Sequence, residues 1–238
     1  MYLAILLAFV ILIVAIAIRG KLRMKKLLSI SATGDMRFKH SLWNIVFGST
    51  TLLVLFVVCL FAGISFADIG LHPISFDYNI WFTVIVLVLC GALFIQFIYQ
   101  TVSPKYKKTA KDLDDPNKSD YSKVMAALLP RTRNEKIVAV VDSVTTGIYE
   151  EILTRGFLFY IFQMQFPYLS IIFIVLITSL MFGVAHFYQG VQGIIITTIA
   201  GIMLGFLFVV TGSLIPCILL HFFINFSDVF TFKEETVA

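Results

Sequence analysis

The chain has 238 residues, of which 59% are hydrophobic and 13% are charged, and its mean hydropathy is +0.96. A soluble domain of this size could not carry so much apolar surface, so the composition indicates a membrane protein with several spans. The net charge of +4 does not indicate a nucleic-acid partner, because the basic residues are concentrated in two loops. The three cysteines stand singly in apolar runs, without the spacing of a metal site.

Residues 1–18 form the first apolar run. Five basic residues follow it at once: Arg19, Lys21, Arg23, Lys25 and Lys26. A cleaved signal peptide carries its basic residues before the apolar run, so we expect a first span with the N-terminus outside. Residues 43–66 and 78–102 predict a second and a third span. The loop between them contains Asp68 and Asp77 but no Lys or Arg, which indicates that it lies outside.

Residues 103–136 are polar and contain nine Lys and Arg residues, as expected of a cytoplasmic loop. Within this loop, residues 124–129 predict a short helix on the inner leaflet that ends at Pro130. Four further spans are expected: 137–165, 169–187, 190–210 and 214–230.

Seven spans with the N-terminus outside place seven basic residues in the first inner loop, nine in the second and Lys233 in the tail. Only Arg155 remains, inside the fourth span. This one-sided pattern predicts a cytoplasmic C-terminus. We therefore expect an all-α polytopic membrane helix bundle that forms a single integral membrane domain over residues 1–238. Residues 1–136 would supply N-terminal spans and basic loops, and residues 137–230 a helical core.

The fourth span contains Glu150, Glu151 and Arg155, and charge inside a span usually marks function. Glu151 and Arg155 are i,i+4 neighbours in the order that favours an ion pair. Glu150 is left without that partner. A carboxylate without a cation in an apolar setting has a raised proton affinity, which suits a general base working near neutral pH. Glu150 is therefore our candidate base, and the alternative is a buried structural triad that locks helices together.

Polar residues recur at helical spacing on two later spans. Phe182 and His186 are i,i+4 on the fifth, and His221 and Asn225 are i,i+4 on the seventh, with Asp228 on the same face. A lone intramembrane histidine is more often a helix contact than a catalyst. Two histidines, an asparagine and a glutamate pair on three spans instead predict one site, in which the nearest helical partners of His221 are Asn225 and Asp228.

The depth of Glu150 agrees with this site if the fourth helix enters along a wet cavity open to the cytoplasm. Its first turns are polar, and four side chains share one arc: Ser143, Thr146, Glu150 and Thr154. The sixth span contains Gly201 and Gly205 in a GxxxG pattern, which allows close helix packing.

Three motifs thus follow one another on successive apolar helices: Glu150-Glu151-x-x-x-Arg155, Phe182-x-x-x-His186 and His221-x-x-x-Asn225. Together they resemble the CAAX protease and bacteriocin-processing (Abi/CPBP) family, which includes the Ras-converting type of prenyl-protein endopeptidase. The resemblance covers about residues 142–228. It implies an intramembrane endopeptidase that cleaves a membrane-anchored or prenylated protein or peptide in the lipid bilayer, with the active site facing the cytoplasm.

The resemblance also implies roles for these positions. Glu150 with His186 would activate a water, and His221 with Asn225 would hold the oxyanion. Arg155 would hold Glu151 and fix the helix geometry.

A metal version is also chemically reasonable, because Glu150, His186 and His221 could be three zinc ligands with water in the fourth position. There is no HExxH, which excludes a standard zincin. The glutamate mechanism, without a cofactor, is the reading we favour.

Two other functional classes remain open. The chain could be a non-catalytic membrane scaffold or bacteriocin-immunity protein that docks a membrane peptide. It could also be a transporter that uses Glu150 and Glu151 as proton carriers. The intact motifs argue against the first class, and the absence of internal repeats in the sequence argues against the second.

Overall fold

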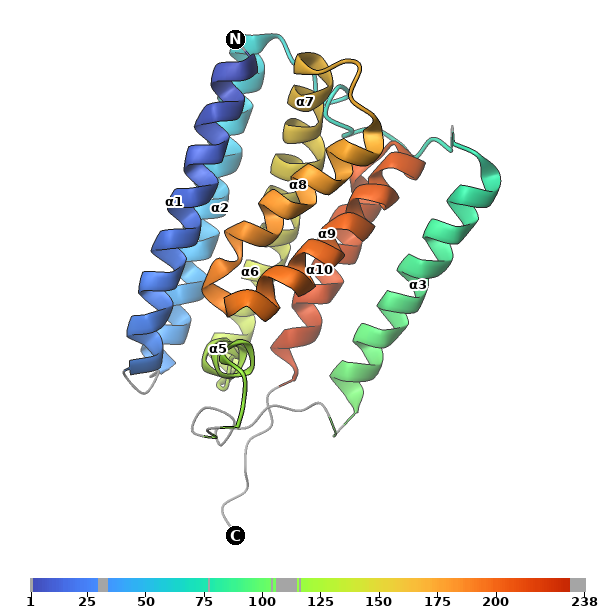
Figure 1. Cartoon of the computed structure of the whole chain (residues 1–238). Helices are drawn as coiled ribbons and strands as arrows, with labels where there is room; N and C mark the ends of the chain where they lie inside the picture. The colour runs from blue at the N-terminus through green and yellow to red at the C-terminus, as the bar shows by residue number, and fades with distance from the viewer. Residues whose placement is uncertain are drawn as a thin grey trace.

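The computed structural model describes the following residues: 2–29, 34–76, 78–103, 105, 115 and 117–231. Over these residues the chain is helical and has no strand, so the predicted all-α architecture is confirmed for them (Figure 1). Asp77, the tail with Lys233, and three basic residues of the second predicted inner loop, Lys107, Lys108 and Lys111, lie outside the described residues.

The described residues of the N-terminal half include four helices: α1 (Tyr2–Ser29), α2 (Gly34–Ala62), α3 (Ile80–Val102) and α5 (Asp120–Leu128). Helix α1 runs on through the basic residues that were expected to end the first span, because Lys and Arg are good helix formers. Helix α3 begins two residues after the predicted start at residue 78. Asn79 caps it, because its side chain accepts the backbone N–H groups of Trp81 and Phe82.

Helix α5 begins earlier than the predicted 124–129, because the Ser119 side chain caps it by accepting the backbone N–H of Ser122. The helix ends before Pro130, as predicted. It lies across one end of the bundle (Figure 1). Val124 and Ala127 are buried, so α5 is packed against the bundle by its apolar side.

The C-terminal half contains the following elements: α6 (Arg133–Glu151), a π-helical segment η2 (Ile152–Leu158), α7 (Phe159–Gln165), α8 (Ile171–Ala185), a 3₁₀ turn η3 (Phe187–Gln189), α9 (Gly190–Thr211) and α10 (Leu214–Val229). Helices α8, α9 and α10 match the last three predicted spans to within a few residues. The predicted fourth span is one continuous run made of α6, η2 and α7, and its π-helical middle was not predicted. Thr132 and Glu135 form a capping box that starts α6.

Helix α6 packs against α2 and α10, α8 packs along α9, and α3 contacts α9 and α10. The close approach of α6 and α10 depends on Gly147, where a Cβ atom would lie 3.1 Å from the backbone nitrogen of Phe222. The main apolar core lies around η2 and α7 and includes Phe157, Leu158 and Ile161. These contacts place the acidic end of α6 in the middle of the bundle.

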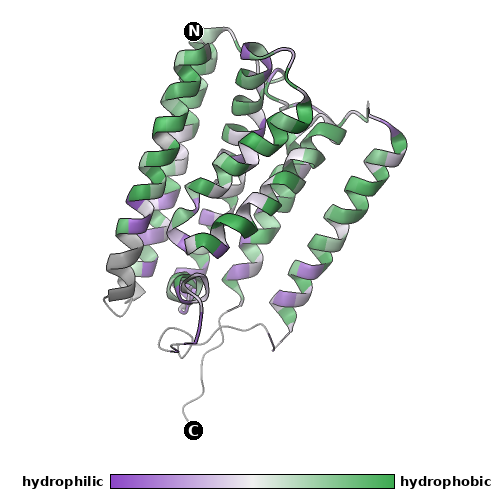
Figure 2. Cartoon of the chain, viewed as in Figure 1, coloured by the Kyte–Doolittle hydropathy of each residue, from purple (hydrophilic) through white to green (hydrophobic). Residues whose placement is uncertain are grey.

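Four helical segments of the described chain are long and apolar enough to cross a membrane: Leu3–Leu22, Met36–Ala62, Ile80–Val102 and Phe187–Thr211. Two shorter apolar helices accompany them, Ile171–Ala185 and Leu214–Val229. Figure 2 shows apolar residues along the length of the long helices and hydrophilic ones gathered toward the end where α5 lies. These features support location in a membrane, whereas the number of seven spans and the orientation stay predictions.

Candidate active site

The predicted pair of Glu151 and Arg155 is present and fully buried. Nη1 of Arg155 donates to Oε1 of Glu151 at 2.8 Å, and the two side chains are 1% and 0% exposed. Arg155 also donates to Thr154 Oγ1 at 2.9 Å and to the Gly201 carbonyl oxygen at 3.0 Å. Its guanidinium carbon lies 4.7 Å from the centroid of the Phe182 ring, a cation–π contact. The pair therefore ties the end of α6 to α8 and α9.

The GxxxG pattern of α9 has a second role beyond helix packing. A Cβ atom at Gly201 would lie 3.1 Å from the Ser179 Cβ and 3.2 Å from Arg155 Nη2, so the missing side chain leaves room for the guanidinium. A Cβ at Gly205 would lie 3.0 Å from Val175 Cγ1. The close packing of α8 and α9 agrees with the prediction, but the space for Arg155 was not foreseen.

His221 lies between the two glutamates. Its Nδ1 is 2.7 Å from Oε1 of Glu151, and its Nε2 is 3.6 Å from Oε2 of Glu150. Because a carboxylate can only accept, Nδ1 is the donor in the first contact. The helical neighbours Asn225 and Asp228 were expected to be the nearest partners of this ring. In the structure, Nδ1 instead donates to Glu151 of α6.

Glu150 has a different environment from Glu151. Its Oε1 accepts the hydroxyl of Tyr149 at 3.0 Å. Its Oε2 is buried and has no hydrogen-bond partner among the described residues. The Tyr149 ring fits against α2 only because position 48 is glycine, where a Cβ would collide with the ring. One carboxylate oxygen of Glu150 is thus held by a hydroxyl, and the other is available.

His186 caps the C-terminal end of α8, and its Nδ1 is 2.9 Å from the carbonyl oxygen of Phe182. A carbonyl only accepts, so Nδ1 carries the hydrogen, and Nε2 of the neutral ring has the free lone pair. The Phe182 ring lies between the two histidines, with centroids 4.7 Å from that of His186 and 6.0 Å from that of His221. The Phe182-x-x-x-His186 motif therefore fixes the tautomer of one histidine and contacts the other.

A cavity of about 630 Å³ joins these groups. The predicted site residues Glu150, His186, His221 and Asn225 line it. Glu151 and Arg155 are not among its lining residues, in keeping with their complete burial behind His221. The polar arc predicted on the fourth span also faces this cavity, through Ser143, Thr146, Glu150 and Thr154.

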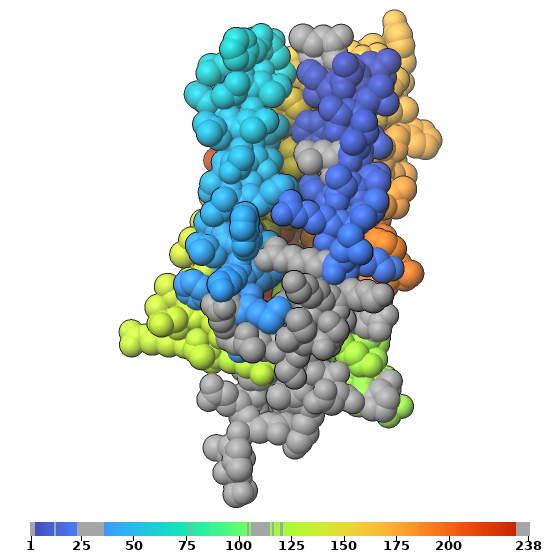
Figure 3. All heavy atoms as spheres, turned by 90° about the vertical axis from the view of Figure 1, so that its left-hand side faces the viewer, coloured from blue at the N-terminus to red at the C-terminus, as the bar shows by residue number. Residues whose placement is uncertain are grey.

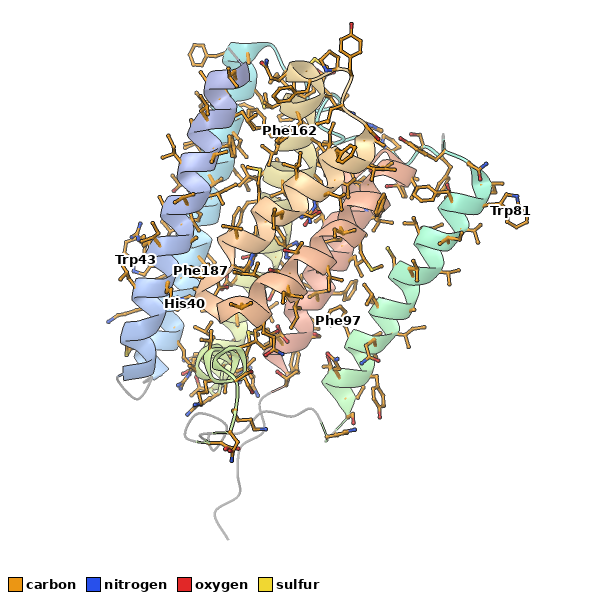
Figure 4. The ribbon with its side chains drawn as sticks, viewed as in Figure 1. His40, Trp43, Trp81, Phe97, Phe162 and Phe187 are labelled. Atoms are coloured by element: carbon orange, nitrogen blue, oxygen red, sulfur yellow. The ribbon has the colours of Figure 1, made fainter. Side chains whose placement is uncertain are left out.

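Residues of α2 complete the polar wall, although nothing in the sequence of the N-terminal half indicated this. Asn44 Nδ2 donates to Asp142 Oδ2 at 3.3 Å and lies 3.4 Å from His40 Nε2. Thr146 Oγ1 donates to the other oxygen of Asp142 at 3.1 Å. Figure 4 shows His40 in the half of the bundle nearer to α5, with Phe162 toward the opposite end. The cavity therefore lies in the half that α5 covers.

On one side the cavity wall is made by α1 and α2. Phe9, Ile13 and Ile16 of α1 face it together with Trp43 and Phe47 of α2. Helix α1 packs on α7, α8 and η3, whereas α2 packs on α6. Figure 3 looks onto these two helices and shows them as separate ridges with a furrow between them. The apolar residues of this cavity wall thus lie on the two helices that border the furrow.

The candidate metal ligands do not form a metal centre as they are placed. Within the described part of the chain, no group of three or more His, Cys, Asp or Glu side chains could hold a metal ion together. Glu150, His186 and His221 line one cavity, and Nδ1 of each histidine is hydrogen-bonded to a protein oxygen. Because an oxygen partner at one ring nitrogen also orients metal-ligating histidines, these hydrogen bonds favour neither the metal nor the metal-free scheme.

Comparison with known proteins gives one match. Residues 132–227 match the family described as type II CAAX prenyl endopeptidase Rce1-like. No curated protein and no solved structure matches the chain. The matched segment begins at the cap of α6 and extends into α10, so it includes all six predicted site residues. Over this segment, the chain is similar to the type II CAAX prenyl endopeptidases.

Proposed function

We propose that the chain is an intramembrane endopeptidase that hydrolyses a peptide bond of a membrane-associated protein or peptide. The observation that carries this proposal is the Glu150 Oε2 atom, which is buried, has no hydrogen-bond partner among the described residues, and lies 3.6 Å from His221 Nε2 on a common cavity. Such an oxygen can take a proton from a water molecule. The family of residues 132–227 supports the same reaction class.

In the proposed first step, a water donates its proton to Glu150 as its oxygen bonds to the scissile carbonyl carbon. The Tyr149 hydroxyl holds Oε1, so Oε2 is the oxygen that faces the water. His186 assists from the same cavity, because its neutral ring has an acceptor at Nε2 once Nδ1 is bonded to Phe182.

The carbonyl oxygen becomes negative in this step, and His221 and Asn225 are its proposed donors. His221 donates from Nε2 in the ring that carries both protons, while Nδ1–H stays on Glu151. Glu151, held by Arg155, thus positions the imidazole without touching the substrate. When the tetrahedral intermediate collapses, the carbon–nitrogen bond breaks and the proton on Glu150 passes to the leaving amine.

The substrate would enter from the bilayer between α1 and α2. Ile13, Ile16 and Phe47 of these two helices line the cavity, as do the polar residues of α6. A peptide with a hydrocarbon anchor can leave its anchor at this apolar wall while its backbone reaches Glu150. This arrangement favours a membrane-anchored substrate, including a prenylated one, over a soluble peptide.

Catalysis in this proposal needs no tightly bound metal. The Asn225 amide can donate directly to the oxyanion, and the placement of Glu150, His186 and His221 gives no joint metal site. Purified protein should therefore contain far less than one zinc per chain, and its activity should survive prolonged chelation in detergent. Stoichiometric zinc, with chelator-sensitive activity that added zinc restores, would overturn this part and make the three residues ligands.

Membrane proteomics tests the function directly. Cells producing the wild type and cells producing Glu150→Ala are compared for new C-termini of membrane proteins, with Asp115→Asn as a control that removes an acidic group from a loop. We expect C-termini that appear with the wild type and the control and disappear with Glu150→Ala. If no C-terminus depends on Glu150, the non-catalytic scaffold or immunity protein becomes the better interpretation.

A further inference from the structure

A second pocket, separate from the catalytic cavity, lies at the start of α6. It has a volume of about 520 Å³, and none of its lining residues lines the catalytic cavity. Three cations, Arg131, Arg133 and Lys136, surround it together with Thr132. Its remaining wall is apolar and is formed by residues of α6 and by Phe230. Proteolysis as proposed above makes no use of this pocket.

The acid nearest to these cations is already engaged. Glu135 is the acidic residue in the first turn of α6, and it is 5% exposed. Arg37 Nε donates to its Oε2 at 3.0 Å, and Arg37 Nη2 donates to its Oε1 at 3.2 Å. The same carboxylate accepts the backbone N–H of Arg131 at 2.7 Å. The charge of Glu135 is therefore balanced by Arg37, and Arg133 and Lys136 are left to act on an incoming anion.

The apolar wall shows which anion fits. Ile137 and Val140 line the pocket one turn further into α6. Ile137 is 55% exposed, and Val141 and Val144 continue the exposed apolar surface along the helix with 48% and 41%. A free phosphate ion would leave this surface in contact with water, whereas the acyl chain of a phospholipid would cover it. Along α6, the cations come first and the exposed apolar residues follow. A phospholipid has the same arrangement, with a charged headgroup followed by an acyl chain.

We propose that this pocket binds the headgroup phosphate of an anionic phospholipid. Arg133 and Lys136 face the phosphate, Arg131 and Thr132 border it, and an acyl chain lies along Ile137 and its neighbours on α6. Basic pockets beside membrane helices on the cytoplasmic side are suited to anionic headgroups. The lipid would hold the start of α6 at the membrane surface, and so set the depth at which the catalytic part of that helix lies.

Lipid binding to the full-length protein in neutral detergent tests this, with native mass spectrometry or quenching by a labelled phosphatidylglycerol as the readout. The probes are phosphatidylglycerol, phosphatidylcholine, glycerol phosphate and inorganic phosphate. The test variant is Arg133→Gln with Lys136→Gln. The matched control is Lys118→Gln with Lys123→Gln, which removes the same charge from the neighbouring basic segment. A third variant, Ile137→Gln, keeps the cations and spoils the apolar wall.

We expect the wild type and the control to bind phosphatidylglycerol tightly, and the test variant to bind it roughly 30-fold more weakly, since each membrane-surface cation contributes about fivefold. Ile137→Gln should weaken the binding of phosphatidylglycerol and leave the binding of glycerol phosphate unchanged. Equal losses in the test variant and the control would show unspecific charge attraction and overturn the proposal. Binding of inorganic phosphate as tight as that of phosphatidylglycerol would also overturn it, because the site would then recognise a free ion.

Discussion

Glu150 and Glu151 of α6 have different surroundings, although they are consecutive in the sequence. Glu151 is completely buried, and its Oε1 accepts from both Arg155 and His221. Oε2 of each glutamate is buried without a hydrogen-bond partner among the described residues, but only Glu150 lines the cavity. The sequence could predict the Arg155 pair, because an i,i+4 spacing is a local pattern. It could not predict the His221 contact, because that joins residues 70 positions apart.

Substitutions at Glu150 and Arg155 should separate the base from the positioning pair. Glu150→Gln keeps the hydrogen bond from Tyr149 but cannot accept a proton, so it should abolish turnover and leave the melting temperature unchanged. Arg155→Ala should lower the free energy of unfolding by about 3–5 kcal/mol, because the buried carboxylate of Glu151 loses its ion-pair partner and keeps only the hydrogen bond from His221. Turnover of a membrane peptide and thermal unfolding in detergent measure the two effects.

Glu151→Gln with Arg155→Ala is the control for the second effect, since it removes the unpaired charge and should recover part of the lost stability. Near wild-type turnover in Glu150→Gln would show that another group is the base.

At the scale of elements, the change from α to π geometry directly after Glu151 is the feature that the sequence did not reveal. Residues 152–158 are apolar except for Thr154 and Arg155, as expected of any helix in this position. The Thr154 hydroxyl donates to the Glu150 carbonyl at 2.5 Å, where the backbone pattern changes. π-Helical turns inside α-helices often occur at functional sites. Here Arg155, which donates to the Gly201 carbonyl oxygen, lies within the π-helical segment.

The limits of α3, α8, α9 and α10 could be predicted closely, because apolar runs bounded by caps and turns are local signals. The contribution of α1, α2 and α5 to the cavity wall could not. The contact between Asn44 and Asp142 joins residues 98 positions apart, and no periodic pattern records such a pairing. For the same reason the motifs identified Glu150 and His221, but not Tyr149 or Asn44, as residues of one cavity.

The distance between α6 and α10 should control activity through Gly147. In Gly147→Val the new Cβ would meet backbone atoms of Phe222, which cannot move as a side chain can, so the helices must separate. We expect a cost of about 1–3 kcal/mol in stability and a loss of turnover of at least roughly tenfold, as His221 moves away from Glu151.

Gly91→Val is the matched control for Gly147→Val. It places the same side chain in α3, where nothing lies within 4 Å of the added Cβ. Thermal unfolding and peptide turnover of both variants are compared with the wild type. Equal effects of the two substitutions would show a general helix propensity effect and remove the special role of position 147.

At the scale of the whole molecule, polar and apolar residues divide the bundle into two ends. Helix α1 begins at the end opposite to α5, and the hydrophilic residues gather on the α5 side (Figures 1 and 2). The cavity around Glu150 and the basic pocket both belong to that side, since Pro130 lines the first and Arg131 the second. If the positive-inside rule holds for this chain, both sites open toward the cytoplasm.

Cysteine labelling of intact cells tests this orientation. Cys59, Cys90 and Cys217 are free and buried, so they can be replaced and single cysteines introduced at Asp115 and His72. Asp115 lies in the basic segment before α5, and His72 in the loop that joins α2 to α3. A membrane-impermeant maleimide should label His72→Cys on intact cells, and Asp115→Cys only after the membrane is opened. The reverse pattern would place the α5 end outside, where neither a cytoplasmic substrate nor the anionic lipids of the inner leaflet could reach these sites.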